Sequence, residues 1–81
     1  MSLNIEELKK KIIYRSTYRG SKEMDRLLFS FSSSIMDNLD ENELKNLLNL
    51  LNVDDENLYN FRIGKKININ IENNRITKMF K

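Results

Sequence analysis

The chain has 81 residues, and its 14 lysines and arginines against 12 aspartates and glutamates leave a net charge of +2. The length allows one small domain, and a charge this small does not indicate nucleic-acid binding. Cysteine and histidine are both absent, which excludes disulfides, thiolate metal sites and the commonest general base. We therefore expect neither an enzyme nor a metal site. No apolar run approaches the roughly 20 residues of a membrane span, so no membrane insertion is expected.

The first helix is expected over residues 4–17, with Asn4 as its N-cap. Ile5, Leu8 and Ile12 fall on one face, and lysines 9–11 spread around the polar side. This pattern is typical of an amphipathic helix that packs on one side only.

Two arginines, Arg15 and Arg19, are four positions apart near the end of this segment. If helical geometry continues that far, they share one side of the chain. Two cations this close repel each other, so the pair suits an acidic or phosphate-bearing partner. A pair of solvated surface arginines remains the alternative interpretation.

The second helix is expected over residues 21–34. Its apolar stripe consists of Met24, Leu27, Leu28, Phe31 and Ile35. Arg19, Gly20 and Glu23 lie at or before its first turn and outside this stripe. Packing of the core therefore does not explain them, and they are the first candidates for function.

A purely structural role is open for each of these positions. Ser21 can be the helix N-cap, and Gly20 can be a turn residue that needs a positive φ. An acid in the first turn, such as Glu23 or Asp25, gains about 0.3–1 kcal/mol from the helix dipole.

Residues 36–39 form a connection, and the third helix follows with Asp40 as its N-cap. Glu43 stands three residues later, which is the spacing of a capping box. The buried face is expected to consist of Leu44, Leu47, Leu48 and Leu51. The fourth helix begins after residue 53, with Asp54 or Asp55 as its cap, and stops at Gly64.

The tail, residues 65–81, is open to two interpretations. Ile67, Ile69 and Ile71 alternate with polar residues, as in a strand or hairpin. A final helix that is capped by Asn70 and ends near Phe80 suits the other helices better. We therefore predict an all-α bundle of about five helices in one domain, residues 1–81, with a helical core over residues 4–64.

Residues 19–23 read Arg-Gly-Ser-Lys-Glu, and an apolar helix, a leucine-rich segment (47–51) and an acidic segment (54–58) follow. In this order the sequence resembles the flavinators, the FAD assembly factors of succinate dehydrogenase, whose motif is R-G-x-x-E. The resemblance covers about residues 8–66. Two positions depart from the family pattern: Tyr18 replaces a second arginine, and Phe61 replaces the usual tryptophan.

The resemblance implies a chaperone-like assembly factor that binds the flavoprotein subunit of succinate dehydrogenase, or that of fumarate reductase. There it would promote covalent attachment of FAD to a histidine of the partner, without holding a cofactor stably itself. The implied partner-binding residues are Arg19, Gly20 and Glu23, with Arg15 and Asp25 in second place. Glu23 would pair with a partner cation or orient Arg19.

We further expect a monomer. The bacterial cytoplasm is the expected compartment, because the motif lies too close to Met1 to leave room for a transit peptide. A trimmed eukaryotic form would belong to the mitochondrial matrix.

The alternative function is a helical nucleic-acid-binding domain that uses lysines 9–11, Arg15 and Arg19 on phosphates. It predicts binding that weakens steeply with salt. The low net charge and the acids at 54–56 count against it. An enzyme that pairs Glu23 with Asp25 is disfavoured, because residues two apart on a helix point in different directions.

Overall fold

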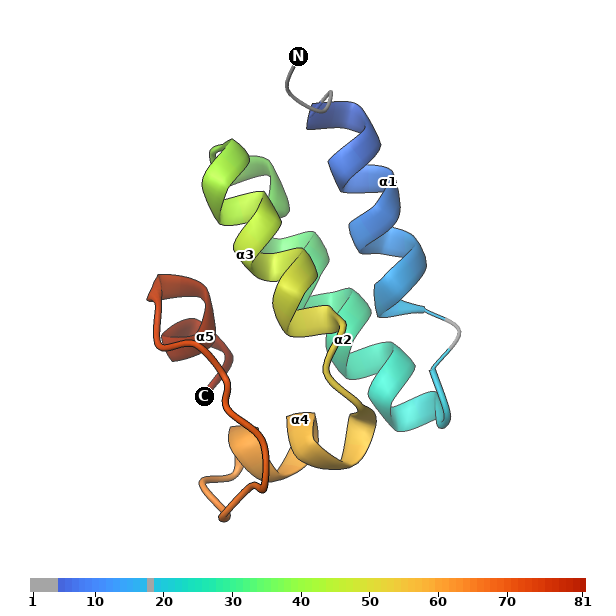
Figure 1. Ribbon diagram of the computed structural model, residues 1–81. Coiled ribbons are helices and arrows are strands. Elements are labelled where there is room, and N and C mark those ends of the chain that lie inside the picture. The colour runs from blue at the N-terminus through green and yellow to red at the C-terminus, as the bar shows by residue number, and fades with distance from the viewer. Residues whose placement is uncertain (1–4, 18) are drawn as a thin grey trace.

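The computed structural model describes residues 5–17 and 19–81. In these residues five α-helices and one short 3-10 helix follow one another (Figure 1), with these bounds: α1 Ile5–Ser16, α2 Lys22–Ile35, η1 Met36–Asn38, α3 Glu41–Leu51, α4 Asp55–Arg62 and α5 Arg75–Phe80. The same residues contain no strand. The predicted all-α architecture is therefore confirmed.

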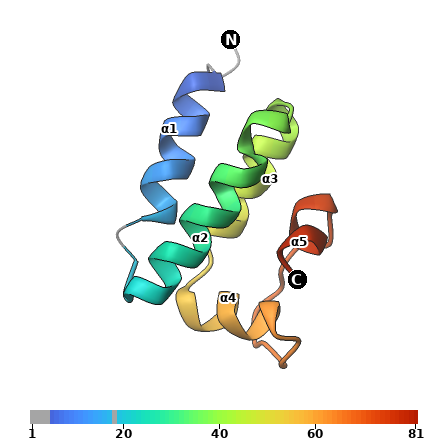
Figure 2. The same ribbon diagram turned by 180° about the vertical axis from the view of Figure 1, so that it is seen from behind.

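The helices form a layered bundle with α3 at its centre. Figures 1 and 2 show α1 and α5 on opposite sides of α3, α2 behind it, and α4 across the lower end of the molecule. The α1–α2 connection and the α3–α4 connection both lie toward that lower end, which brings the start of α2 close to the start of α4. None of the helices in the described chain is long and apolar enough to cross a membrane.

Local hydrogen bonds define the helix starts that the sequence predicts. Ser21 caps α2 by accepting from the backbone N–H of Met24, and Asp54 caps α4 in the same way. At α3 the capping box is complete. The Asp40 side chain accepts from the backbone N–H of Glu43, and the Glu43 side chain accepts from the backbone N–H of Asp40. These bonds satisfy backbone donors that a helix start otherwise leaves without a partner.

Gly64 follows the last turn of α4 with a φ of 82°, a left-handed conformation that favours glycine. It thereby ends the helix where the sequence predicts.

The predicted start of the last helix is wrong. Asn74, not Asn70, caps α5, and Thr77 completes a reciprocal pair of bonds with it. Residues 65–74 form neither a helix nor a strand. Ile5 is also less buried than predicted, with 42% of its surface exposed. The expected Asn4 cap and the substitution at Tyr18 lie outside the residues that the structure describes.

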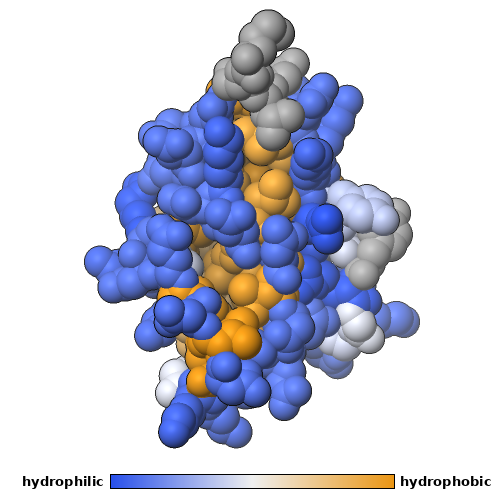
Figure 3. Space-filling model, in the orientation of Figure 1, coloured by the Kyte–Doolittle hydropathy of each residue, from blue (hydrophilic) through white to orange (hydrophobic). Residues whose placement is uncertain are grey.

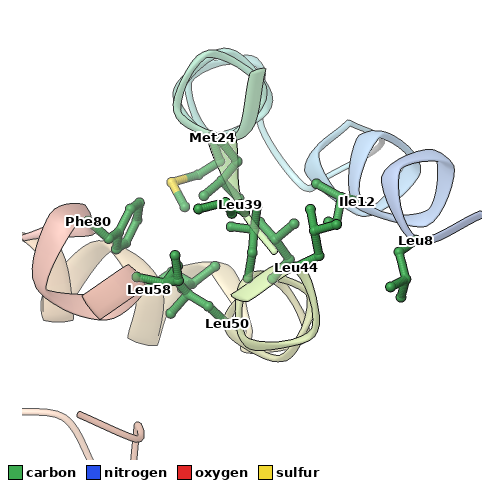
Figure 4. Packing of buried hydrophobic residues seen from close by; sticks show 12 residues of the cluster. Leu8, Ile12, Met24, Leu39, Leu44, Leu50, Leu58 and Phe80 are labelled. Carbon is green, nitrogen blue, oxygen red and sulfur yellow. The ribbon is translucent and has the colours of Figure 1, made fainter. Parts of the chain in front are cut away.

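All five helices contribute to one core (Figure 4). Its fully buried side chains include Ile12 of α1, Leu28 of α2, Leu47 of α3, Leu58 of α4 and Phe80 of α5. Burial of one such side chain contributes about 1.5–3 kcal/mol. The six-residue α5 is too short to be stable in water as an isolated helix. Its structure therefore depends on the burial of Phe80 in the core.

Candidate functional site

The Arg19 side chain joins three helices at the lower end of the bundle. Its Nη1 donates to the main-chain oxygens of Leu51 (2.6 Å) and Arg15 (2.9 Å), and its Nη2 donates to that of Val53 (2.7 Å). Its Nε donates to Oδ1 of Asp55 at 2.7 Å. Only 12% of the side chain is exposed. The guanidinium therefore ties the ends of α1 and α3 to the start of α4.

Two carboxylates hold the adjoining backbone, which we call the Arg19–Gly20 turn. Asp55 Oδ2 accepts from the backbone N–H of Gly20 at 3.0 Å, and Asp25 Oδ1 accepts from the backbone N–H of Arg19 at 2.6 Å. Asp55 thus bonds both the side chain of Arg19 and the backbone of its neighbour. It is the first residue of α4, where the positive end of the helix dipole favours a carboxylate.

Asp55 is the site residue that sequence reasoning missed. From the sequence, Asp55 is a possible helix cap and part of the acidic segment, and Glu23 is the residue expected to pair with a partner cation or to orient Arg19. The structure gives the orienting role to Asp55 instead. The acidic segment at 54–58 was the one signal in the sequence, and it does not distinguish the cap, Asp54, from the ligand of Arg19.

Glu23 and Arg15 present their side chains to the surface. Both residues are exposed, and neither side chain makes a hydrogen bond or ion pair with the described residues. The structure therefore brings Arg19, Gly20 and Asp25 into one hydrogen-bonded unit, while Glu23 and Arg15 stand outside it with their charges available.

Gly20 does not have the positive φ that a turn interpretation predicted; in the described chain that conformation is found at Gly64. A Cβ at Gly20 would lie 3.4 Å from Asp55 Oδ2, which is an ordinary van der Waals distance. Neither backbone strain nor internal crowding therefore requires glycine here. Gly20 is exposed, so the space above its backbone is open to a partner.

An open pocket of about 320 Å³ lies beside the turn; its walls are Tyr14, Arg15, Thr17, Arg19, Gly20, Asp54 and Asp55. Asp54 carries a negative charge there at neutral pH. Hydrogen bonds from the side chain and then the backbone of Asn57 hold the pKa of the Asp54 carboxyl below its ordinary value of 3.8. The pocket thus has cationic and anionic walls facing one space.

The arrangement presents groups that are suited to binding a partner. The sequence has no histidine or cysteine, and the residues from 5 onward that the structure describes contain no acidic cluster able to hold a metal ion. What the site offers is a rigid turn with an exposed glycine backbone, an exposed carboxylate and an exposed arginine.

Comparison with known proteins gives two matches. The family described as "Flavinator of succinate dehydrogenase" matches residues 10–81. The chain is also 38% identical over 61 residues to a protein of Dictyostelium discoideum named "Succinate dehydrogenase assembly factor 2, mitochondrial". That alignment covers 75% of this chain and 43% of the relative, so the chain spans less than half of the relative's length. No solved structure matches the chain.

Proposed function

Because this chain belongs to the flavinator family of succinate dehydrogenase, we propose that it acts as an assembly factor for the flavoprotein subunit of that enzyme. It binds the subunit and promotes covalent attachment of FAD to a histidine of the subunit. The family consists of assembly factors rather than catalysts, and a chain without histidine or cysteine suits that role. The flavoprotein of fumarate reductase is a second client to be tested in the same assay.

The Arg19–Gly20 turn is the observation that carries this proposal. The backbone N–H groups of the turn donate to the carboxylates of Asp25 in α2 and Asp55 in α4, so the turn is held in place before a partner binds. A surface that is already ordered loses little conformational entropy on binding, so more of the contact energy remains as affinity. An assembly factor of this kind holds its client in a reactive geometry, and positioning alone can supply about 7–11 kcal/mol of a barrier.

On this proposal the candidate residues have two roles. Arg19 and Asp25 are positioning residues, because their hydrogen bonds lie within the chain. Gly20, Glu23 and Arg15 are the contacts with the client. Gly20 lets a client backbone approach closely, Glu23 pairs with a cation, and Arg15 pairs with a carboxylate.

A reconstitution tests the function. The purified protein is mixed with the apo flavoprotein subunit and FAD, the mixture is denatured and separated on a gel, and covalent flavin is read by fluorescence. We expect the flavin band to depend on this protein and to be lost with Glu23→Ala. Glu56→Ala is the matched control, since Glu56 is the second residue of α4 as Glu23 is of α2, and both are exposed.

One result would contradict the proposed function, and another would contradict the role given to Glu23. A band of equal strength without this protein, with a properly folded client, would remove the assembly function. Loss of helical circular dichroism in Glu23→Ala would show instead that this acid stabilises α2.

A further inference from the structure

A groove between α1 and α3 adjoins the site described above. It has a volume of about 490 Å³, and it is formed by Lys10, Lys11, Tyr14, Arg15, Leu48 and Asn52. Tyr14 and Arg15 line this groove and also the pocket at the Arg19–Gly20 turn, so the two hollows lie next to each other. Figure 3 shows an apolar band between hydrophilic flanks on the face where α1 and α3 lie side by side. We call this hollow the α1–α3 groove.

The α1 wall of the groove carries uncompensated positive charge. Lys10, Lys11 and Arg15 form no ion pair with the residues that the structure describes. Lys9, which does not line the groove, is paired with Asp37 at 3.2 Å. The three groove cations therefore lack a negative partner within the described chain, and each is exposed. Charge complementarity favours an anionic occupant along this wall.

The neighbouring pocket at the Arg19–Gly20 turn has charges of both signs on its walls. Asp54 and Asp55 line this pocket, and the exposed Asp54 carboxyl is ionised at neutral pH, as an ordinary aspartate is. A nucleic-acid backbone has a negative charge at every phosphate, so it would be repelled where it reaches these carboxylates. A protein segment can instead place its acidic residues beside α1 alone.

The α3 wall supplies an apolar contact. Leu48 is half-buried, lines the groove and packs against the core. A protein segment can bury an apolar side chain against it, which a phosphate backbone cannot do. Tyr14, with 63% of its surface exposed, adds an amphipathic aromatic side chain at the junction of the two hollows, a residue type enriched in protein interfaces.

We propose that the α1–α3 groove binds an acidic segment of the client flavoprotein. Carboxylates of that segment lie beside Lys10, Lys11 and Arg15, and one of its apolar side chains lies on Leu48. This inference rests on the proposed function and adds the chemistry of the segment that docks beside Gly20 and Glu23. It also makes Lys10 and Lys11 of α1 part of the docking surface.

The first test compares two double charge reversals, Lys10→Glu/Lys11→Glu and Lys65→Glu/Lys66→Glu. Each replaces two adjacent exposed lysines, so both change the net charge equally. Binding of the purified flavoprotein subunit is titrated at low and high salt. We expect the groove variant to raise the Kd about tenfold or more at low salt, equivalent to about 1.4 kcal/mol, and to reduce the salt dependence. The control variant should stay within about twofold, as is normal for a charge outside the contact.

The second test identifies the docked segment. A photoreactive benzophenone side chain is placed at Asn52, an exposed residue of the groove, and in a control protein at Tyr59, an exposed residue of α4 outside it. After irradiation with the subunit, cross-linked peptides are sequenced. We expect position 52 to link to a peptide rich in aspartate and glutamate, and position 59 to give no such link.

The outcomes separate the two proposals. If the unaltered protein binds the subunit and the groove variant binds it equally well, the groove inference is wrong and the assembly function stands. Linkage of position 52 to a neutral or basic peptide of the subunit would also show that the groove inference is wrong, and it would leave the assembly function in place. Failure of the unaltered protein to bind either flavoprotein would overturn both. Release of the subunit by a mixed-sequence single-stranded oligonucleotide at equal concentration would assign the groove to nucleic acid instead.

Discussion

The Arg19 guanidinium donates to three main-chain oxygens and one carboxylate, all within the chain. Truncation to alanine would leave these acceptors and the partly buried Asp55 without their donor. We therefore expect Arg19→Ala to lose about 1.5–3 kcal/mol of unfolding free energy, the range for hydrogen bonds that involve charged groups. Glu23→Ala should stay within about 0.5 kcal/mol, because Glu23 is exposed and makes no such bond. Urea unfolding measures both values.

A double-mutant cycle that combines Arg19→Ala with Asp55→Ala tests whether loss of the Arg19–Asp55 ion pair causes the destabilisation. Because Asp55 binds Arg19 directly, the two substitutions should be coupled by about 0.5–3 kcal/mol. Simple additivity of the two losses would show that the ion pair contributes nothing to the turn.

Substitution of Gly20 distinguishes an effect on client docking from an effect on folding. A Cβ there meets only Asp55 Oδ2, at an ordinary distance, and the backbone has no positive φ. We expect Gly20→Ala to change the unfolding free energy by less than about 1 kcal/mol, with a gain possible through the less flexible unfolded chain. Covalent flavin formation in the reconstitution should nevertheless fall sharply. A variant that is fully active would show that no client backbone approaches this position.

The sequence singles out part of this site and misses the rest. Arg19, Gly20 and Glu23 stand out because the apolar stripe of α2 does not use them. Asp55 does not stand out, because its contact with Arg19 joins positions 36 residues apart. No helical periodicity or local spacing encodes such a contact. It depends on the way α4 crosses the end of the bundle (Figure 1).

At the scale of the helices, Asp54 makes the stability of α4 depend on pH. Its pKa in the folded protein lies below the ordinary 3.8, so the folded state binds fewer protons than the unfolded state in this range. The stabilisation is complete above 3.8 and is lost as the pH falls through the lower folded value. Asp54→Asn keeps a capping oxygen but cannot titrate. The difference in unfolding free energy between the two proteins should shrink as the solution becomes more acidic than pH 3.8.

Urea unfolding at a series of acidic pH values measures this difference. A difference that stays constant throughout would mean that the Asp54 cap has the same strength whether the carboxyl is charged or neutral.

Helix starts could be predicted where the cap is a local signal. Ser21, Asp40 and Asp54 each accept from a backbone N–H three residues later, within a span that a short pattern describes. The last helix differs, because both Asn70 and Asn74 precede residues with helical spacing. In the structure Asn74 is the cap, and Ile71, which lies between the two candidates, is partly buried against the core from outside the helix. That burial is a tertiary contact, and the sequence of the tail does not contain it.

For the molecule as a whole, one core joins all five helices, and the C-terminal Phe80 is part of it. The Phe80 ring lies 5.1 Å from that of Phe31 and 6.5 Å from that of Phe61, and the Arg62 guanidinium lies over it at 5.3 Å. Arg62 also donates to the main-chain oxygen of Phe80 at 2.9 Å. The tail is therefore fastened to the last turn of α4, while Asp55 fastens the first turn of α4 to the Arg19–Gly20 turn.

This arrangement makes α4 the link between two ends of one cooperative unit. Asp55 and Phe80 share no partner in the contacts described above, and the eight residues of α4 separate their attachment points by about 10 Å. We expect Asp55→Ala and Phe80→Leu to destabilise the protein independently, with Phe80→Leu losing about 1 kcal/mol of aromatic contact. Their effects should add within about 0.5 kcal/mol in the double variant.

Urea unfolding followed by far-ultraviolet circular dichroism and by tyrosine fluorescence tests this additivity. A domain of this size should unfold in one transition that both signals report together. If the Phe80→Leu variant instead unfolds in two steps, α5 separates from the bundle before the rest of the core melts. The Arg19–Gly20 turn would then keep its geometry without the tail, and Phe80→Leu would leave covalent flavin formation unchanged.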